Sequence, residues 1–349
     1  MNNIKKIGFS ALAGSLAMVS AHAVDYTMSG GLTSTYSVAD NTNNVAADTG
    51  RGFGVATDLG FTAAGELDNG YTVTMFMSLD TNAAVTNTSS QLTVGMGSLG
   101  TLQLNNIAGA KANGIDDITP NAYNEVWDGM TGSAAINNPS FFGSATASGS
   151  LDYRIPAQSY EGMTINASVT YDPNAGVGGA SKGGVVSTGE RSGVAYTLQI
   201  AHESGFEIGG GHESVDAISA SPGSHGVQSA TGYVKYATGG LSVAYQESYL
   251  DSAAEQGGTA TAGAADKESV IYSVAYTSGD MTVSYGEAEV DTNAIGSTAA
   301  LSTVELSSIQ AAYTMGAMTI SAAISKTDNE AGVTAQEYTE NQLAISFAF

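Results

Sequence analysis

The stretch FGVATDLGFTAAGELDNGYTVTMFMSL, residues 53–79, decides the fold class of this chain. In its first half every second residue falls on a mainly apolar face: Phe53, Val55, Thr57, Leu59 and Phe61. Asp68-Asn69-Gly70 then permits a tight reversal, because Asn-Gly tolerates positive φ. The alternation resumes from Tyr71 to Leu79. A period of two is typical of a β-strand, so the stretch predicts a β-hairpin with one apolar face.

The same alternation recurs to the end of the chain and predicts sixteen strands. Short turns alternate with eight longer polar segments, which is typical of an outer-membrane barrel with short periplasmic turns and long extracellular loops. Sixteen strands would enclose an interior too wide for small side chains to fill, so we expect a water-filled lumen and a lipid-covered apolar face. We therefore predict an all-β, 16-stranded antiparallel transmembrane β-barrel. A soluble β-sandwich is the alternative, and it fits the loop pattern less well.

The amino-acid composition excludes several classes of function. The 349 residues hold 33 Asp and Glu against 10 Lys and Arg, for a net charge of −23. Such a polyanion repels nucleic acid and favours cations. Cysteine is absent, which excludes disulfides, thiolate metal sites and thiol catalysis. No Ser-His-Asp set has a usable arrangement, and we predict no enzyme activity, no catalytic residues and no metal site.

The first 23 residues have the pattern of a cleaved signal peptide. Lys5 and Lys6 precede the small, apolar run Ile7–Val19, and Ala21-His22-Ala23 matches a signal peptidase site. We expect residues 1–23 to be removed and residues 24–349 to form one barrel. Removal would leave eight basic residues.

One segment, residues 105–147, has no strand period and is too long for an ordinary connection. It holds one base, Lys111, and four acids: Asp116, Asp117, Glu125 and Asp128. Carboxylates around a narrow aqueous pore raise the local cation concentration. We predict that this segment folds inward as the pore constriction and that Trp127 anchors it. The alternative is a solvated surface loop.

Side-chain parity predicts the basic wall of the pore. Arg154, Arg191 and Lys235 are out of phase with the apolar residues of their strands and should face the lumen, as should the acid Asp58. Arg51 shares the parity of Phe53 but sits at a loop edge, and we include it as a fourth wall base.

Three motifs resemble the general bacterial porins of Gram-negative bacteria. Gly97–Leu104 is similar to the turn and strand that precede the third loop of that family, and Leu151–Pro156 with Gly162-Met163-Thr164 is similar to the strand and turn that follow it. The chain ends on Leu343, Ile345, Phe347 and Phe349, and the last three resemble the signal read by the outer-membrane assembly machinery. The resemblance implies a homotrimer of sixteen-stranded barrels with the third loop inside each pore. The family usually has an arginine cluster facing that loop, and this chain has few bases.

The resemblance implies passive diffusion of small polar solutes and ions in the outer membrane, and the acids predict a preference for cations. The alternatives are a substrate-specific channel of the same fold, or a non-conducting structural or adhesive barrel. Expected partners are the lipid bilayer, lipopolysaccharide, further copies of the chain and the assembly machinery. No cofactor is predicted. Ca²⁺ at acidic loop tips such as Asp40-Asn41, and divalent cations at the lipid-facing Glu247, Glu287 and Glu289, stay open, as does the plain alternative that these glutamates lie in water.

Overall fold

The computed structural model describes residues 24–42, 49–81, 85–128, 139–143, 146, 148–175, 192–216, 226–252, 265–294 and 301–349. Residues 1–23 lie outside the described part, so the signal peptide stays a prediction. Arg191 and parts of the long segment also lie outside it. Among the described residues, no helix is both long and apolar enough to cross a membrane.

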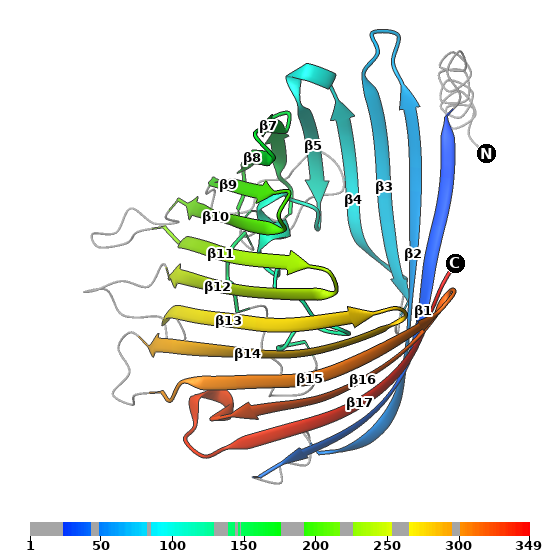
Figure 1. The fold of residues 1–349 in the computed structure, drawn as a ribbon. Coiled ribbons are helices and arrows are strands. Elements are labelled where there is room, and N and C mark those ends of the chain that lie inside the picture. Colours follow the sequence, from blue (N-terminus) through cyan, green and yellow to red (C-terminus); the bar gives the residue numbers. More distant parts are fainter. Residues whose placement is uncertain are drawn as a thin grey trace, which may run out of the picture.

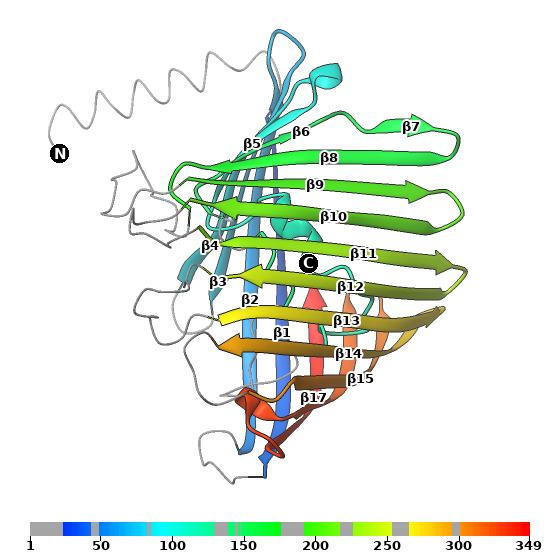
Figure 2. The same cartoon turned by 90° about the vertical axis from the view of Figure 1, so that its left-hand side faces the viewer.

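All strands belong to one antiparallel sheet that closes on itself (Figures 1 and 2). The strands are β1 (Asp25–Asn41), β2 (Gly50–Glu66), β3 (Thr72–Thr81), β4 (Val85–Gly95), β5 (Thr101–Asn106), β6 (Leu151–Arg154), β7 (Gln158–Tyr160), β8 (Met163–Asp172), β9 (Gly193–His202), β10 (Phe206–Val215), β11 (Gln228–Thr238), β12 (Leu241–Asp251), β13 (Ala265–Ser278), β14 (Met281–Ala294), β15 (Val304–Met315), β16 (Met318–Asp328) and β17 (Glu337–Ala348). Three single-turn 3₁₀ helices, η1 (Gly97–Leu99), η2 (Ala112–Ile115) and η4 (Glu330–Gly332), are the helical elements of the described part.

The barrel has sixteen strands, as predicted, because β6 and β7 are two pieces of one strand. Both pair with β8. Pro156 lies in the gap between them, and a proline has no N–H to give to the ladder. Gly100 comes close to this gap with φ of 91°, and a Cβ there would lie 2.3 Å from the Arg154 carbonyl oxygen. Only glycine fits that approach.

Closure is made by the two ends of the barrel. β17 pairs with β1 from Gly31↔Ala348 to Asn41↔Tyr338. The last residue extends this ladder, since Phe349 and Gly30 exchange two backbone hydrogen bonds of 2.8 and 2.9 Å. The first and last strands are therefore paired with each other, which removes the open sheet edges that a bilayer would not tolerate.

The outer face carries the apolar residues of the alternation. Phe53, Val55, Met75, Ile309 and Phe347 are among the exposed large side chains, and Phe53 is 84% exposed. Such a continuous apolar surface needs lipid to cover it. The inner face is not only small and polar, because Ile271, Leu306 and Tyr338 point inward and are buried. The long segment between β5 and β6 covers them.

Short turns gather at one end of the barrel and longer connections at the other, as Figure 2 shows for β7–β14. The connection between β3 and β4 spans only residues 82–84, which makes it the exception. Residues 107–150 between β5 and β6 form the longest connection, and the described part of it lies inside the barrel (Figure 1).

Candidate functional site: the inner loop and its wall

The connection between β5 and β6, here called the inner loop, binds to polar side chains of the barrel wall through its own backbone. Gln246 Nε2 donates to the Ile115 carbonyl oxygen at 3.0 Å, and Ser273 Oγ donates to that of Pro120 at 2.6 Å. Farther along, the Ala122 N–H donates to Ser284 Oγ at 2.9 Å. These contacts come from β12, β13 and β14 in turn, so the loop crosses the inner face of the barrel strand by strand.

Apolar side chains of the inner loop fill two patches on the wall. Val126 and Trp127 pack with a group of inward-facing residues: Ile271, Ala288, Val290, Val304, Leu306 and Tyr338. Ala112, Ile115 and Phe142 pack with Ala195 and Tyr233. Trp127 is 5% exposed, so its indole anchors the loop to the wall. Burial of this apolar surface, at about 25 cal/mol per Å², favours the inward position of the loop.

Four predicted acids lie on residues 116–128 of the inner loop, here called the tip segment. Asp117 and Asp128 are exposed, Glu125 is half-buried and Asp116 is buried. A side-chain hydrogen bond joins Asp116 and Asp117, and it acts to lower the pKa of Asp117. Among the described residues, no salt bridge joins Asp117, Glu125 or Asp128 to a base.

Two tip carboxyls, Asp117 and Glu125, have raised pKa values. Loss of water inside the barrel raises the pKa of Glu125, and the charges of Asp117 and Asp128 raise it further. Loss of water likewise raises the pKa of Asp117, and the charge of Asp128 adds to the rise. Glu125 also accepts from Asn121 Nδ2 at 3.3 Å, which favours its ionised form. The three carboxyls therefore act as one electrostatic group.

The loop base, defined here as Lys111 with Arg154 and Asp152 of β6, has a different arrangement. Asp152 is fully buried, and its Oδ2 accepts from the Lys111 N–H at 2.7 Å and from Arg154 Nη2 at 3.1 Å. Its Oδ1 accepts from Thr170 Oγ1 at 2.5 Å. Burial lowers the pKa of Lys111, and the charge of Arg154 lowers it further. The wall arginine is therefore held beside a buried carboxylate.

The other predicted wall residues are not brought together with Arg154. Lys235 is half-buried near the short-turn end of β11, where it pairs in register with Glu207. Arg51 is exposed at the start of β2, beside the long-loop end. Asp58 lies across the ladder from Asp80, and a side-chain hydrogen bond joins the two. Arg191 lies outside the described residues.

Several inner-loop contacts were not apparent from the sequence. Glu213 of β10 is 1% exposed and accepts from both the N–H and Oγ1 of Thr146 at 2.8 Å. Lys267 Nζ of β13 lies 5.4 Å from the centre of the Phe141 ring. Gln310 of β15 bonds to the tip segment. Strand parity alone would place Glu213, Lys267 and Gln310 in the lumen. The sequence does not show that the inner loop contacts them, because that depends on the path of the loop through the barrel.

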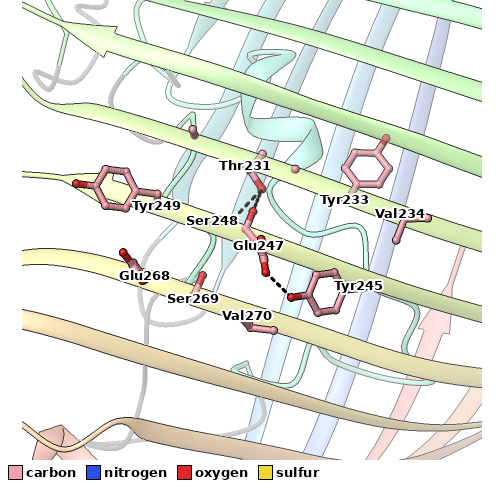
Figure 3. Close-up of a pocket in the computed structure, with 12 residues that line it drawn as sticks. Thr231, Tyr233, Val234, Tyr245, Glu247, Ser248, Tyr249, Glu268, Ser269 and Val270 are labelled. Carbon is pink, nitrogen blue, oxygen red and sulfur yellow. Dashed lines mark hydrogen bonds between the residues drawn. The ribbon is translucent and has the colours of Figure 1, made fainter.

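A groove of about 650 Å³ also lies on the outer face, across β11, β12 and β13. Figure 3 shows Tyr245, Glu247, Tyr249 and Glu268 along it, with the Tyr245 hydroxyl bonded to Glu247 Oε1. A second outward glutamate, Glu287, accepts from the hydroxyl of Tyr285. These carboxylates thus have tyrosine donors on the outer surface. Within the described ranges, no three His, Cys, Asp or Glu side chains form a group that could hold a metal ion.

The C-terminal residues Ile345, Phe347 and Phe349 lie on the outer face of β17 and beyond it, exposed toward lipid. At the other end of β1, Asn41 Nδ2 donates to Glu330 Oε2 at 2.5 Å, and the Asn41 N–H donates to Asp40 Oδ1 at 3.0 Å. The Asp40-Asn41 pair, for which calcium was an open expectation, thus has protein partners.

Comparison with solved structures finds the same architecture. A loop-deletion mutant of OmpT, an outer-membrane protein of Vibrio cholerae, aligns with 94% of this chain and all of its own at a TM-score of 0.65 and 10% identity. The anion-selective porin from Comamonas acidovorans aligns with 94% of this chain and all of its own, at 0.64 and 14% identity. Salmonella typhi OmpF, solved with daunomycin, aligns over 93% of this chain and 97% of its own, at 0.62 and 11%. At these identities the likeness establishes the fold.

A search of curated protein sequences finds no match. A family model described as Gram-negative porin matches residues 9–349, which is nearly the whole chain. The sixteen-stranded barrel, its apolar outer face and its inward loop agree with that match. The chain therefore belongs to the Gram-negative porin family and is a multi-pass β-barrel of the outer membrane.

Proposed function

We propose that the chain forms a water-filled, non-enzymatic channel for passive diffusion of small hydrophilic solutes, with a preference for cations. Asp117, Glu125 and Asp128 supply the selective charge, with Asp116 beside them. Arg154, Lys235, Arg191 and Arg51 supply a thin basic counterpart, and Asp58 adds a second acidic position on the wall.

One observation carries the cation preference: the tip segment and the loop base differ in how their charges are compensated. Asp117, Glu125 and Asp128 have no base in a salt bridge among the described residues. Arg154 faces the buried carboxylate Asp152 at 3.1 Å. The uncompensated charge of the tip segment is therefore negative, and a negative constriction enriches cations.

The fold by itself does not decide the sign of the preference, because an anion-selective porin has the same fold. The side chains of the inner loop and its wall must therefore decide it. In this chain those side chains include several acids, while the whole sequence holds only ten Lys and Arg.

Planar bilayers with purified protein test the proposal. We expect conductance that rises linearly with voltage, and a reversal potential in a KCl gradient that shows K⁺ passing more readily than Cl⁻. Anion preference would refute the charge argument. Saturable transport with competitive block would favour a substrate-specific channel, and absence of conductance would favour a structural or adhesive barrel.

We also propose that the protein is a homotrimer that contacts its partners through the outer face of β1–β3. Tyr26, Met28 and Phe53 are exposed there, and Phe53 stacks near Tyr36 with ring centres 4.9 Å apart. Light scattering of the detergent complex should give three copies. A Phe53→Glu variant should shift it toward monomers while a Leu198→Glu variant on β9, away from β1–β3, should not.

The terminal residues Phe349, Phe347 and Ile345 are proposed as the signal for the assembly machinery. Phe349 also closes the ladder with Gly30. A Phe349→Ser variant keeps that backbone ladder, so reduced insertion in cells together with normal refolding in detergent would support recognition by the machinery. Equal loss in both would indicate a structural role alone.

A further inference from the structure

Gln310 makes three hydrogen bonds to the inner loop, more than any of the wall side chains described in the previous subsections. Gln310, on β15, is 4% exposed. Its Oε1 accepts from the Tyr123 N–H at 2.9 Å and from the Asn124 N–H at 3.2 Å. Its Nε2 donates to the Asn124 carbonyl oxygen at 2.6 Å and to Ser308 Oγ at 3.0 Å. All four bonds come from one amide group.

This pattern fixes the orientation of the amide. Two backbone N–H donors face Oε1, and a backbone carbonyl faces Nε2, so the flipped amide would set donor against donor and acceptor against acceptor. The inner-loop partners are all backbone groups. The contact therefore holds the path of the chain at residues 123–124, whatever the side chains there are.

Those two backbone positions directly precede the selective carboxylates. Glu125 is the next residue, and Asp128 lies three residues farther, with its N–H bonded to the Glu125 carbonyl oxygen at 3.0 Å. Trp127, between them, is held in the apolar patch of β13–β17. The segment from 125 to 128 is thus held at its start by the Gln310 amide and from within by the Trp127 indole.

The other polar contacts of the tip segment are single bonds. Ser284 Oγ accepts one N–H, that of Ala122, and Ser273 Oγ donates to one carbonyl, that of Pro120. Gln342 of β17 reaches only the Asn124 side chain, at 3.5 Å. A buried donor or acceptor that loses its partner is costly, so loss of Gln310 would strand three backbone groups of the tip at once.

We propose that Gln310 is the positioning residue that sets the ion preference and the open-state stability of this pore, by holding the backbone at 123–124 so that Glu125 and Asp128 stay at the constriction. The ion-preference part rests on the proposed function. Gln310 itself carries no charge and acts through the loop.

Single-channel recording of three variants tests this role. Gln310→Leu removes all four bonds at similar volume, and Gln310→Glu keeps the acceptor but sets an oxygen against the Asn124 carbonyl. Gln342→Leu is the matched control, since it removes the same residue type and one weak contact with the same loop, together with a bond of 3.0 Å to Glu340 on its own strand. We expect a several-fold rise in open-channel current noise and closure at lower voltage for both Gln310 variants, and a wild-type trace for Gln342→Leu.

Ion preference is measured in the same recordings. Gln310→Leu should bring the K⁺ to Cl⁻ permeability ratio closer to one, although it removes no charge. A quiet Gln310→Leu channel with unchanged preference overturns the proposal and leaves the acidic constriction intact. A wild-type channel without cation preference refutes the proposed function, while the noise comparison still tests whether Gln310 holds the loop.

A cysteine pair separates positioning from folding, because the natural chain contains no cysteine. In the Asn124→Cys/Gln310→Cys variant, a short bis-methanethiosulfonate reagent can join only these two positions, through two reducible disulfides that form with loss of methanesulfinate. Joined channels should be quiet and reduced channels noisy, with the same melting curve by circular dichroism in both states. Equal noise in the joined and reduced states contradicts the proposed role.

Discussion

The tip segment and the loop base are parts of one inner loop, yet they treat charge in opposite ways. At the base, the buried carboxylate Asp152 accepts from the Arg154 guanidinium and from the backbone N–H of Lys111. At the tip, Asp117, Glu125 and Asp128 face one another with no base in a salt bridge among the described residues. Charge that is compensated at short range has little effect on a passing ion, whereas uncompensated charge acts at longer range.

The number of acids and bases near a pore therefore does not by itself predict whether the pore prefers cations or anions. Asp152 is an acid on the lumen side, but it stabilises the wall rather than attracting solute cations. We therefore propose a structural role for the charges at the base and a selective role for those at the tip. Each prediction below changes one side of this comparison.

Neutralisation of the tip should have the largest effect. The triple variant Asp117→Asn/Glu125→Gln/Asp128→Asn removes the uncompensated charge and keeps side-chain size, so the cation preference should disappear while single-channel conductance stays within the same range. Reversal potentials in a KCl gradient measure it.

The matched control removes three carboxylates from the outer face, in Glu247→Gln/Glu287→Gln/Glu289→Gln. It changes the net charge equally but lies outside the pore, so the preference should be retained. Equal loss of preference in both triple variants would indicate that total charge, rather than the tip, sets the selectivity.

Removal of the shared carboxylate at the base should act mainly on stability. Asp152→Asn leaves Arg154, whose side chain is 31% exposed, beside a neutral amide. The cost should be below the roughly 3 kcal/mol for loss of one partner of a fully buried ion pair. We expect a lower melting temperature together with a weaker cation preference. Asp128→Asn, at the exposed tip, is the contrasting variant, and it should weaken the preference without a comparable loss of stability. Equal melting temperatures for the two variants would contradict the division between base and tip.

Much of the barrel could be predicted, because each lipid-facing strand must alternate. Residues 53–79 alone predict a hairpin, and the structure pairs β2 with β3 in that register. Residues 80–90 are one of the eight longer polar segments that the sequence predicts as loops, and for this segment the prediction is wrong: β3 reaches Thr81 and β4 begins at Val85. The strands continue beyond the apolar belt, where Thr and Asn face both sides and the alternation that marks a membrane strand is lost.

The inner loop could be predicted only in part. Its length and Trp127 pointed to an inward, anchored segment. Its backbone partners could not be found, because Gln310 and Glu213 look like any lumen-facing polar residue in the sequence. Asp152 was missed for a related reason, since parity gives the direction of a side chain and not its burial.

Acidification should remove the negative charge of the tip segment before it protonates ordinary carboxyls. Because desolvation and neighbouring charge raise the pKa values of Glu125 and Asp117, these groups take up protons at a higher pH than model carboxyls, which titrate near about 4. Their negative charge is present above the raised pKa and is lost as the pH falls through it. As the pH falls, the cation preference should therefore begin to decline at pH values above those at which ordinary carboxyls titrate.

Reversal potentials recorded from neutral to acidic pH measure this decline. In Asp117→Asn/Glu125→Gln the step should vanish, which assigns it to the tip. A step that persists unchanged in this variant would place the titrating groups elsewhere in the pore.

The smallest effects should come from the basic wall. Arg154→Gln leaves Asp152 with one cationic neighbour fewer, so the cation preference should rise slightly. Lys235→Gln should change it less, because Lys235 lies near the short-turn end of β11, and mobile ions screen exposed charges beyond about 10 Å at 0.1 M salt.

Recording both variants in dilute and in concentrated KCl distinguishes the effects of the two positions. The Lys235→Gln effect should be visible only in dilute salt, whereas the Arg154→Gln effect should persist at higher salt because protein surrounds part of that ion pair. A Lys235→Gln effect that survives concentrated salt would mean that Lys235 faces the tip carboxylates directly. The charge of the tip segment would then be partly compensated, contrary to the contrast drawn between tip and base.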